Sequence, residues 1–508
     1  MLSGVQRDSR ADEWRRPVRL TFNTNSMRDY ETFLAVRRCP VYRFDGSFAD
    51  VPDEYAERIF GEVRNSQDVD YDPSLFLFDY QRDISRMAIR KRKFAAFVEC
   101  GLGKTLILLE FARHAEQQTD GKPILIVCPL MVIQQTMEEA ERFYPGMPIQ
   151  QVKGADLQEW IDNGSGIGIT NYESFNNPLR GGRLGGMIID ESSMLKSHYG
   201  KWGTSIIEVA AGCEWKLALT GTPAPNDRIE YANHAVFLGA CRTVNEFLAR
   251  YFVNRGQTDN RWEMKPHALG AFYRDLSHWA IFLSDPSVYG WRDNADKIPP
   301  INVHIHEVDL LQEQRKAMQN VTGGLMVGNI GGIGMRSKLG QIAKGKHNGE
   351  SIGTNKTGFI QDLVGGWPDE SSLIWCKYNP EQDTISKAFP DAANIDGSTP
   401  MEKRAELIKA FKSGEIKTLI SKPKILGFGL NLQRVTRQVF STLEDSYESY
   451  WQAVKRSNRV GSTRALNVHI PVTELEEPMV QNVLRKAAMV ESDTKEQQRI
   501  FRELAWDR

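Results

Sequence analysis

Two groups of residues, far apart in the chain, have the composition needed to bind and cleave a nucleoside triphosphate. The first is the segment Glu99-Cys100-Gly101-Leu102-Gly103-Lys104-Thr105, which follows the apolar run 94–98 and precedes a helical pattern. Glycine backbone can approach phosphate oxygens, and a helix N-terminus favours their charge. Lys104 is expected to reach the β- and γ-phosphates, and the Thr105 hydroxyl to ligate Mg²⁺. The segment therefore predicts nucleotide binding by Gly101, Leu102, Gly103, Lys104 and Thr105, although Val98 stands where the strict pattern has its first glycine.

An acidic pair, Asp190-Glu191, ends a second apolar run. Asp190 is expected near the metal ion, directly or through water, and Glu191 near the attacking water as general base or as its orienting group. The alternative is a surface pair at a strand end, which is common. The hydroxyls of 219–223 (Leu-Thr-Gly-Thr-Pro) could sense the γ-phosphate, or the segment could be a plain exit from a strand. Combined with Lys104, the acidic pair favours hydrolysis.

The second group lies near the carboxyl end of the chain. Glycines in the segment 426–432, Gly429 among them, let the backbone approach phosphate or a nucleic-acid strand. Gln452, Arg456 and Arg459 fall at i, i+4 and i+7, which predicts one stripe on a helix running from 447 to 459. Such a stripe could be a solvated face, or it could supply arginine forks for γ-phosphate charge in the transition state.

Upstream of the first group, Gln81 follows a tyrosine at the start of a helical pattern. Its amide could donate to and accept from the adenine edge, which would select ATP. The alternative is an ordinary residue of a helix start. We include Gln81 among the predicted ATP-binding residues.

Composition limits the possible classes of protein. The chain has 508 residues, of which 41% are hydrophobic and 25% charged, as in soluble globular proteins of about two to four domains. A net charge of −1 excludes a basic surface over the whole chain, so a nucleic-acid contact requires a local groove. The six cysteines show no CxxC pair or zinc spacing, which indicates a reducing compartment and no structural metal. We predict no membrane span, because the apolar run 124–133 is far shorter than about 20 residues.

Two blocks of short apolar runs alternate with helical patterns, which predicts an α/β protein with parallel sheets covered on both faces. The expected strands are 94–98, 124–128, 167–170, 187–189 and 216–219 in the first block, and 373–376, 393–395, 418–421, 438–441 and 466–471 in the second. Between the blocks, 226–300 reads as helical and aromatic, and 321–358 as a glycine-rich loop. One helix is expected to begin with Thr399 as N-cap and to end at Gly414.

The motifs, in this order, resemble those of superfamily 2 helicases, and most closely the Swi/Snf-type translocases of double-stranded DNA. The phrases Glu-x-Gly-Leu-Gly-Lys-Thr at 99–105, Gly-Leu-Asn-Leu-Gln at 429–433 and Gln-Ala-x-x-Arg-x-x-Arg-x-Gly at 452–461 carry this resemblance. Tyr80-Gln81 matches the Q motif, Asp190-Glu191 motif II, 219–223 motif III, and 427–433 motif V. Motif II continues with Ser193 where a histidine often stands, which puts the coupling of hydrolysis to DNA in doubt.

The resemblance implies two tandem RecA-like lobes with ATP and Mg²⁺ between them, duplex DNA across both, and tracking without obligatory strand separation. Catalysis would then rest on Lys104, Thr105, Asp190, Glu191, Gln452, Arg456 and Arg459, and the metal on Thr105 and Asp190. DNA backbone contacts would involve Gln134, Tyr172, Lys377, Lys422 and Lys424. We expect a monomer on DNA, in the cytoplasm of a bacterial or phage-infected cell, or in the nucleus of a eukaryote.

The expected domains are a small N-terminal accessory domain (1–70), a first lobe (71–240), a helical insertion (241–300), a linker with a second-lobe protrusion (301–358), a second lobe (359–490) and a C-terminal tail (491–508). Three alternatives to a translocase stay open. A strand-separating or branch-migration helicase would share every motif, a motor subunit of a repair or restriction assembly would dock a protein through 1–70, and a non-catalytic scaffold would tolerate loss of Lys104 or the arginines.

Overall fold

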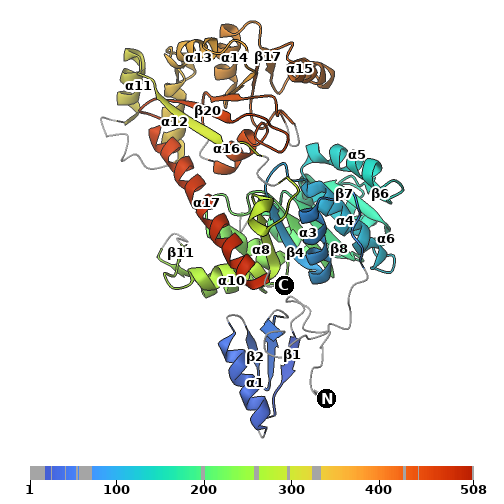
Figure 1. Cartoon of the computed structure of the whole chain (residues 1–508). Helices are drawn as coiled ribbons and strands as arrows, with labels where there is room; N and C mark the ends of the chain where they lie inside the picture. The colour runs from blue at the N-terminus through green and yellow to red at the C-terminus, as the bar shows by residue number, and fades with distance from the viewer. Residues whose placement is uncertain are drawn as a thin grey trace. The chain divides into compact units, whose positions relative to one another are not determined.

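The structure is a computed structural model, and it divides the chain into two compact units (Figure 1). The described residues are 18–23, 26–39, 42–52, 55–56, 71–195, 201–256, 262–294, 298–322, 333–426, 431–443 and 446–505. The first unit comprises Met1–Ala295 and Val490–Arg508, and the second comprises Asp296–Met489. None of the helices within the described ranges is long and apolar enough to cross a lipid bilayer.

The first unit contains a seven-stranded parallel sheet in the order β12-β4-β9-β8-β5-β7-β6. Its strands are β4 Lys93–Val98, β5 Ile124–Cys128, β6 Ile149–Gln151, β7 Ile167–Asn171, β8 Gly186–Asp190, β9 Trp215–Leu219 and β12 Ala280–Leu283. The central strands β5, β8 and β9 are buried along their whole length. Such strands read as continuous apolar runs because helices cover both faces of the sheet, and the sequence located each of them to within one residue.

Helices connect these strands and pack against them. They are α3 Asp79–Lys91, α4 Lys104–Gln117, α5 Ile133–Phe143, α6 Leu157–Asn163, α7 Lys201–Val209, α8 Tyr231–Phe237, α9 Val244–Tyr251 and α10 Leu269–Trp279, with the short 3₁₀ turns η1 Leu130–Val132, η2 Tyr172–Asn176, η3 Ser192–Leu195, η4 Arg228–Glu230 and η5 Pro286–Tyr289. Figure 1 shows α3 and α4 beside β4 and β8, as their contacts require. The first turn of α4 therefore follows the carboxyl end of β4, where ligands bind in open α/β sheets.

The sequence predicted a helical insertion for residues 241–300, but this segment also contains strands. It contains α9 and α10, but also the antiparallel pair β10 Phe252–Asn254 and β11 Trp262–Met264. Its strand β12 pairs in parallel with β4 at the edge of the sheet. The run Ala-Ile-Phe-Leu is too short to separate from a buried helical segment by periodicity, which is why the sequence did not reveal it.

The described part of the N-terminal segment contains a small antiparallel sheet in the order β1-β3-β2. Its elements are β1 Val18–Thr21, α1 Met27–Arg38, β2 Arg43–Asp45 and β3 Phe48–Val51. A separate core formed by Val18, Leu20, Val36, Ala49 and Val51 holds them together.

The second unit contains a six-stranded parallel sheet in the order β13-β20-β19-β16-β18-β17. Its strands are β13 Ile301–Glu307, β16 Ser372–Trp375, β17 Ala393–Ile395, β18 Thr418–Ser421, β19 Arg437–Phe440 and β20 Leu466–Val472. Its helices are α11 Gln312–Thr322, α12 Ile333–Ala343, α13 Lys356–Gly365, α14 Asn379–Ala388, α15 Met401–Ser413, α16 Tyr447–Val454 and the start of α17 Glu477–Ala505, and a two-stranded hairpin pairs β14 Lys346–His347 with β15 Glu350–Ser351. Two parallel sheets with crossover helices confirm the predicted pair of RecA-like lobes.

Several local predictions for the second unit need correction. Pro400 is the N-cap of α15, and the Thr399 hydroxyl instead bonds the Asp396 carboxylate at 3.0 Å. The glycine-rich segment 321–358 contains α12 and the first turn of α13, although 323–332 lies outside the described residues. Gly414 ends α15 with a left-handed φ of 87°, as predicted. The predicted tail is the end of the 29-residue helix α17, and it belongs to the first unit from Val490 onward.

A buried charge cluster lies in the second unit beside the start of α17. Glu476 accepts from Lys356 Nζ at 2.8 Å and from Lys344 Nζ at 3.2 Å, and the exposed fraction of all three side chains is 4% or less. Burial would raise the pKa of Glu476, but the two ammonium groups outweigh it and lower the pKa to about 2. The carboxylate is therefore ionised in the folded protein.

Replacing Glu476 with glutamine is expected to lower the free energy of unfolding by about 3–5 kcal/mol, because two buried lysines lose their counter-charge. Chemical denaturation with circular dichroism measures this change. The matched control is Glu474→Gln, since Glu474 forms a half-exposed ion pair with Arg315 and should change stability by less than about 1 kcal/mol. Equal effects of the two substitutions would contradict the role of the buried cluster.

Three histidines stack across the edge of the second sheet. His306 Nε2 lies 3.0 Å from His469 Nδ1, and the His304 ring stacks on His469 with 4.7 Å between centroids. Burial, assisted by the charges of His304, His306 and Arg437, lowers the pKa of His469 to about 4. His304, His306 and His469 therefore form a packed aromatic cluster on β13 and β20.

Acidification is expected to destabilise the chain partly through His469. Between pH 6.5 and about 4 the unfolded chain binds a proton at this residue that the folded chain does not. Stability should therefore fall as the pH falls through this window, by at most about 3 kcal/mol. Thermal unfolding at pH 7 and pH 5 should show a smaller loss in His469→Phe than in the unsubstituted chain. His267→Phe, which replaces an exposed histidine, should keep the full loss.

Candidate active site

The phosphate-loop segment connects the buried strand β4 to the helix α4. Gly101 and Gly103 have left-handed φ values of 91° and 72°, and Gly103 is the N-cap of α4. A Cβ atom at Gly103 would collide with Gln81 Nε2, so glycine is required both for the conformation and for the space. Lys104 and Thr105 open the 14-residue helix, whose N-terminus favours an anion.

Gln81 uses its amide on the loop itself. Its Nε2 donates to the carbonyl oxygen of Gly103 at 3.1 Å, and its Oε1 accepts from the backbone of Phe78 at 3.0 Å. The side chain is fully buried. In this structure the residue therefore fixes the loop, and the reading of an adenine edge by Gln81 stays a prediction.

The acidic pair ends β8, next to Lys104. Lys104 Nζ donates to the Val98 carbonyl at 3.2 Å. Burial alone would lower the pKa of Lys104, but Cys100, Glu191 and Asp190 together outweigh it and raise that pKa. Burial, with a contribution from Glu191, raises the pKa of Asp190 to about 7 against the opposing charge of Lys104. Ionisable side chains with strongly shifted pKa values, gathered at the end of a strand, are typical of functional sites.

Motif III (219–223) begins at the end of β9, the neighbour of β8, and contacts the acidic pair. The Thr220 hydroxyl donates to the Glu191 carboxylate at 3.3 Å, and the Thr222 backbone donates to Thr220 Oγ1 at 3.1 Å. A Cβ atom at Gly221 would lie 3.2 Å from the sulfur of Cys100, so this glycine allows β9 to end close against the phosphate loop. Of the two predicted readings of this segment, a site element is favoured over a plain strand exit.

The residue Tyr172 corrects one sequence prediction. It was expected to contact DNA, but it is 1% exposed and its hydroxyl donates to the carbonyl oxygens of Asp190 at 2.7 Å and Glu191 at 3.1 Å. A buried ring cannot touch a phosphate backbone, so Tyr172 supports the acidic pair instead. Gln134, Lys377, Lys422 and Lys424 remain candidates for DNA contacts; Lys424 is exposed, and Gln134 also bonds Glu138 at 2.9 Å.

In the second unit, the predicted helical stripe of Gln452, Arg456 and Arg459 is wrong. Helix α16 ends at Val454, so only Gln452 is helical and the two arginines lie in the turn that follows. After Val454 the backbone changes to i→i+3 bonds, with the Arg456 N–H on the Ala453 carbonyl at 3.3 Å and the Ser457 N–H on the Val454 carbonyl at 3.2 Å. The buried Gln438 of β19 also holds this turn, because its Nε2 donates to the same two carbonyls, each at 3.3 Å, and to Ser457 Oγ at 2.8 Å.

The turn that carries the arginines is held from motif V as well. Leu432 donates its N–H to the Arg456 carbonyl at 3.0 Å, and Gln433 Nε2 donates to the Val460 carbonyl at 2.6 Å. Gly461 has a left-handed φ of 94°, which lets the chain turn directly after Arg459. Gln433 and Gln438 are site-building residues that sequence reasoning missed; the glutamine that ends the Gly-Leu-Asn-Leu-Gln phrase was the available signal for the first. Gly429 lies outside the described residues.

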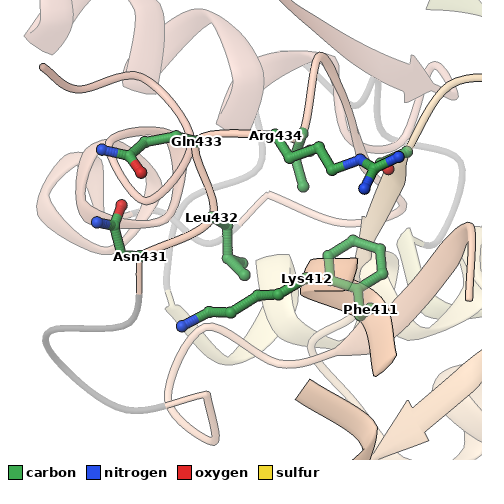
Figure 2. A pocket seen from close by; sticks show the side chains of 8 residues that line it. Phe411, Lys412, Asn431, Leu432, Gln433 and Arg434 are labelled. Atoms are coloured by element: carbon green, nitrogen blue, oxygen red, sulfur yellow. The ribbon is translucent and has the colours of Figure 1, made fainter. Parts of the chain in front are cut away.

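A pocket of about 270 Å³ lies beside this part of motif V. It is lined by Ser371, Phe411, Lys412 and the run 431–435. Figure 2 shows Asn431 and Gln433 on one side of it and Arg434 on another, with Leu432 between them. None of its lining residues belongs to the predicted ATP site, so the pocket is separate from the groups that would perform hydrolysis.

Comparison with models of protein families identifies the family of this chain. The model of the SNF2-related domain matches residues 97–356, just over half of the chain, and that of the helicase conserved C-terminal domain matches residues 356–461. The chain belongs to the SNF2 family. These matches confirm the resemblance of motifs 99–105, 190–191 and 452–461 to superfamily 2.

Curated relatives are distant. The SNF2 chain is 23% identical to the DNA annealing helicase and endonuclease ZRANB3 of Bos taurus, over 77% of this chain and 38% of the relative. It is 23% identical to the putative ATP-dependent helicase/translocase YwqA of Bacillus subtilis, over 76% of this chain and 45% of the relative. It thus spans less than half the length of these relatives. The solved SWI2/SNF2 ATPase core of Sulfolobus solfataricus in complex with dsDNA is 19% identical, with a TM-score of 0.38, over 84% of this chain and 96% of that one.

The residues of the first unit fit the nucleotide and the metal that the SNF2 family implies. Gly101 and Gly103 have left-handed φ values that let the backbone of this loop approach phosphate, and Lys104 follows directly. Asp190 and Thr105 offer one carboxylate and one hydroxyl, which suits Mg²⁺ because this ion keeps waters and phosphate oxygens as its other ligands. A bound Mg²⁺ would neutralise phosphate charge and keep Asp190 ionised at neutral pH.

Proposed function

We propose that this SNF2 chain is a DNA-stimulated ATPase that translocates on double-stranded DNA without obligatory strand separation. The observation that carries the proposal is the convergence of Lys104, Asp190, Glu191 and Thr220 at the carboxyl edge of one parallel sheet. Names of curated relatives, such as DNA annealing helicase and DNA excision repair protein, support DNA as the substrate.

Each residue has a distinct part in the proposed hydrolysis. Lys104 would hold the β- and γ-phosphates, and Thr105 and Asp190 would hold Mg²⁺, whose charge would offset that of the phosphates in phosphoryl transfer. Glu191 orients the attacking water and accepts its proton, and the Thr220 hydroxyl fixes that carboxylate at 3.3 Å. Gln452, Arg456 and Arg459 from the second unit would stabilise the charge that develops on the γ-phosphate. Closure of the two units on ATP would then drive the step along DNA.

The decisive experiment measures ATP turnover with duplex DNA, single-stranded DNA and RNA side by side. Stimulation by duplex DNA above the other two supports the proposal. Triplex displacement is then assayed beside fork unwinding with the same preparation. Displacement without unwinding supports a translocase, whereas unwinding at a comparable rate would identify a strand-separating helicase. No stimulation by any nucleic acid would overturn the proposal.

A further inference from the structure

The turn that carries motif II has an unusual backbone. Glu191 has a φ of 52°, in the left-handed region that residues other than glycine rarely occupy. Its N–H donates to the side chain of Asp190 at 3.0 Å, and the 3₁₀ turn η3 begins at the next residue, Ser192. Strained backbone of this kind persists only where the surrounding structure enforces it. The groups that enforce it here therefore bear on the placement of the Glu191 carboxylate.

Helix α8 holds this turn at two points. His234 Nε2 lies 3.0 Å from Ser192 Oγ, and Asn233 Nδ2 donates to the carbonyl oxygen of Leu195. His234 and Ser192 are completely buried. The imidazole also packs edge-on against Phe97 of β4, with 5.2 Å between centroids. His234 therefore contacts both β4, the strand that leads to the phosphate loop, and the turn that carries motif II.

Each ring nitrogen of His234 has a partner: Nδ1 lies 3.4 Å from the Glu230 carbonyl oxygen, and Nε2 lies 3.0 Å from the Ser192 hydroxyl oxygen. A hydroxyl can donate and accept, so Ser192 can bond the ring in either tautomer. Burial lowers the pKa of His234 to about 4, so the ring is neutral at physiological pH. Ser192, the residue directly after Glu191, is therefore held at its hydroxyl by a buried neutral ring.

We propose that His234 is a positioning residue for ATP hydrolysis, which acts through Ser192 to keep Glu191 in its left-handed conformation. The inference rests on the proposed function, because Glu191 is the residue that orients water there. It also accounts for the departure in motif II. The histidine often found at the fourth position is Ser193 in this chain, and its hydroxyl reaches the Glu191 carbonyl only at 3.5 Å. Helix α8 supplies an imidazole to the same turn from 42 residues away.

The test compares His234→Phe and Ser192→Ala with a control at a second buried histidine. His278 is 1% exposed, lies in the same unit, and pairs its Nε2 with the Tyr55 hydroxyl at 2.9 Å. His278→Phe therefore removes an equivalent buried bond that does not touch motif II. The full-length variants are compared by kcat and KM for ATP with saturating duplex DNA, and by melting temperature.

We expect His234→Phe and Ser192→Ala each to lower kcat about tenfold, with KM for ATP within about twofold of the original. The double variant should be no slower than the slower single one, because both changes break one bond. His234→Gln, which can still bond Ser192, should regain most of the rate. His278→Phe should lower the melting temperature without lowering kcat.

Two results would overturn the inference. One is an unchanged kcat in Ser192→Ala, a variant that loses a single oxygen atom and so tests the idea even if His234→Phe fails to fold. The other is a loss of kcat in His278→Phe equal to that in His234→Phe, which would mean that general destabilisation is the cause. If the unsubstituted chain itself hydrolyses no ATP, the proposed function falls, and this inference falls with it.

Discussion

Lys104→Ala is expected to abolish ATP hydrolysis. The ammonium group interacts with the carboxylates of the buried Asp190 and the half-buried Glu191, and it opposes the rise in the pKa of Asp190, which already reaches about 7. Without Lys104 the Asp190 carboxylate loses a positive charge that favours its ionised, metal-binding form. The same change removes the cation expected to hold the β- and γ-phosphates. Because one substitution removes both the charge that favours metal binding by Asp190 and the phosphate-binding cation, ATP turnover should fall below detection.

Steady-state phosphate release with saturating duplex DNA measures this effect. Lys122→Ala, which replaces an exposed lysine of the same unit, is the matched control and should keep the full rate. Circular dichroism of both variants establishes that the fold is intact. Turnover in Lys104→Ala comparable to that of the Lys122 variant would refute the assignment of the phosphate loop.

The sequence predicted those parts of the site that depend on neighbours in the chain. A buried strand, two glycines and a helix start are contiguous in Val98 to Thr105, so their geometry is set locally. Asp190 and Glu191 were likewise predicted because they end an apolar run that could only be a covered strand. Most strand positions in both sheets followed from the same signal.

Contacts between distant segments explain what the sequence did not reveal. Spacing alone suggested a helix through Arg459, whereas α16 ends at Val454 in a turn that also bonds Gln438, a residue of another strand. Thr399 had the right type for an N-cap, but Pro400 occupies that position and the Thr399 hydroxyl bonds the Asp396 carboxylate. Tyr172 and His234 support motif II from 18 and 42 residues away, and no local pattern distinguishes such side chains from ordinary core residues.

Arg459→Ala is expected to slow hydrolysis by about 10³–10⁵-fold while leaving ATP binding nearly intact, because an arginine finger stabilises charge that forms only in the transition state. Its turn is held in place by the Gln433 bond to Val460 and by the Ser462 hydroxyl, which donates to Ser457 at 2.6 Å. Alanine should therefore leave the backbone of this turn in place. Single-turnover hydrolysis with enzyme in excess measures the rate, and titration with a fluorescent ATP analogue measures binding.

The matched control is Arg464→Ala, since Arg464 is exposed and lies five positions further along the same stretch of chain. A similar modest loss in both variants would mean that Arg459 contributes only general positive charge, which a distant guanidinium could replace. A large loss of ATP affinity in Arg459→Ala would place the residue among the ground-state phosphate contacts. Only a selective loss of rate, absent from the control, is the behaviour of a group that meets the γ-phosphate as it is transferred, and that behaviour requires the second unit to reach the nucleotide held by Lys104.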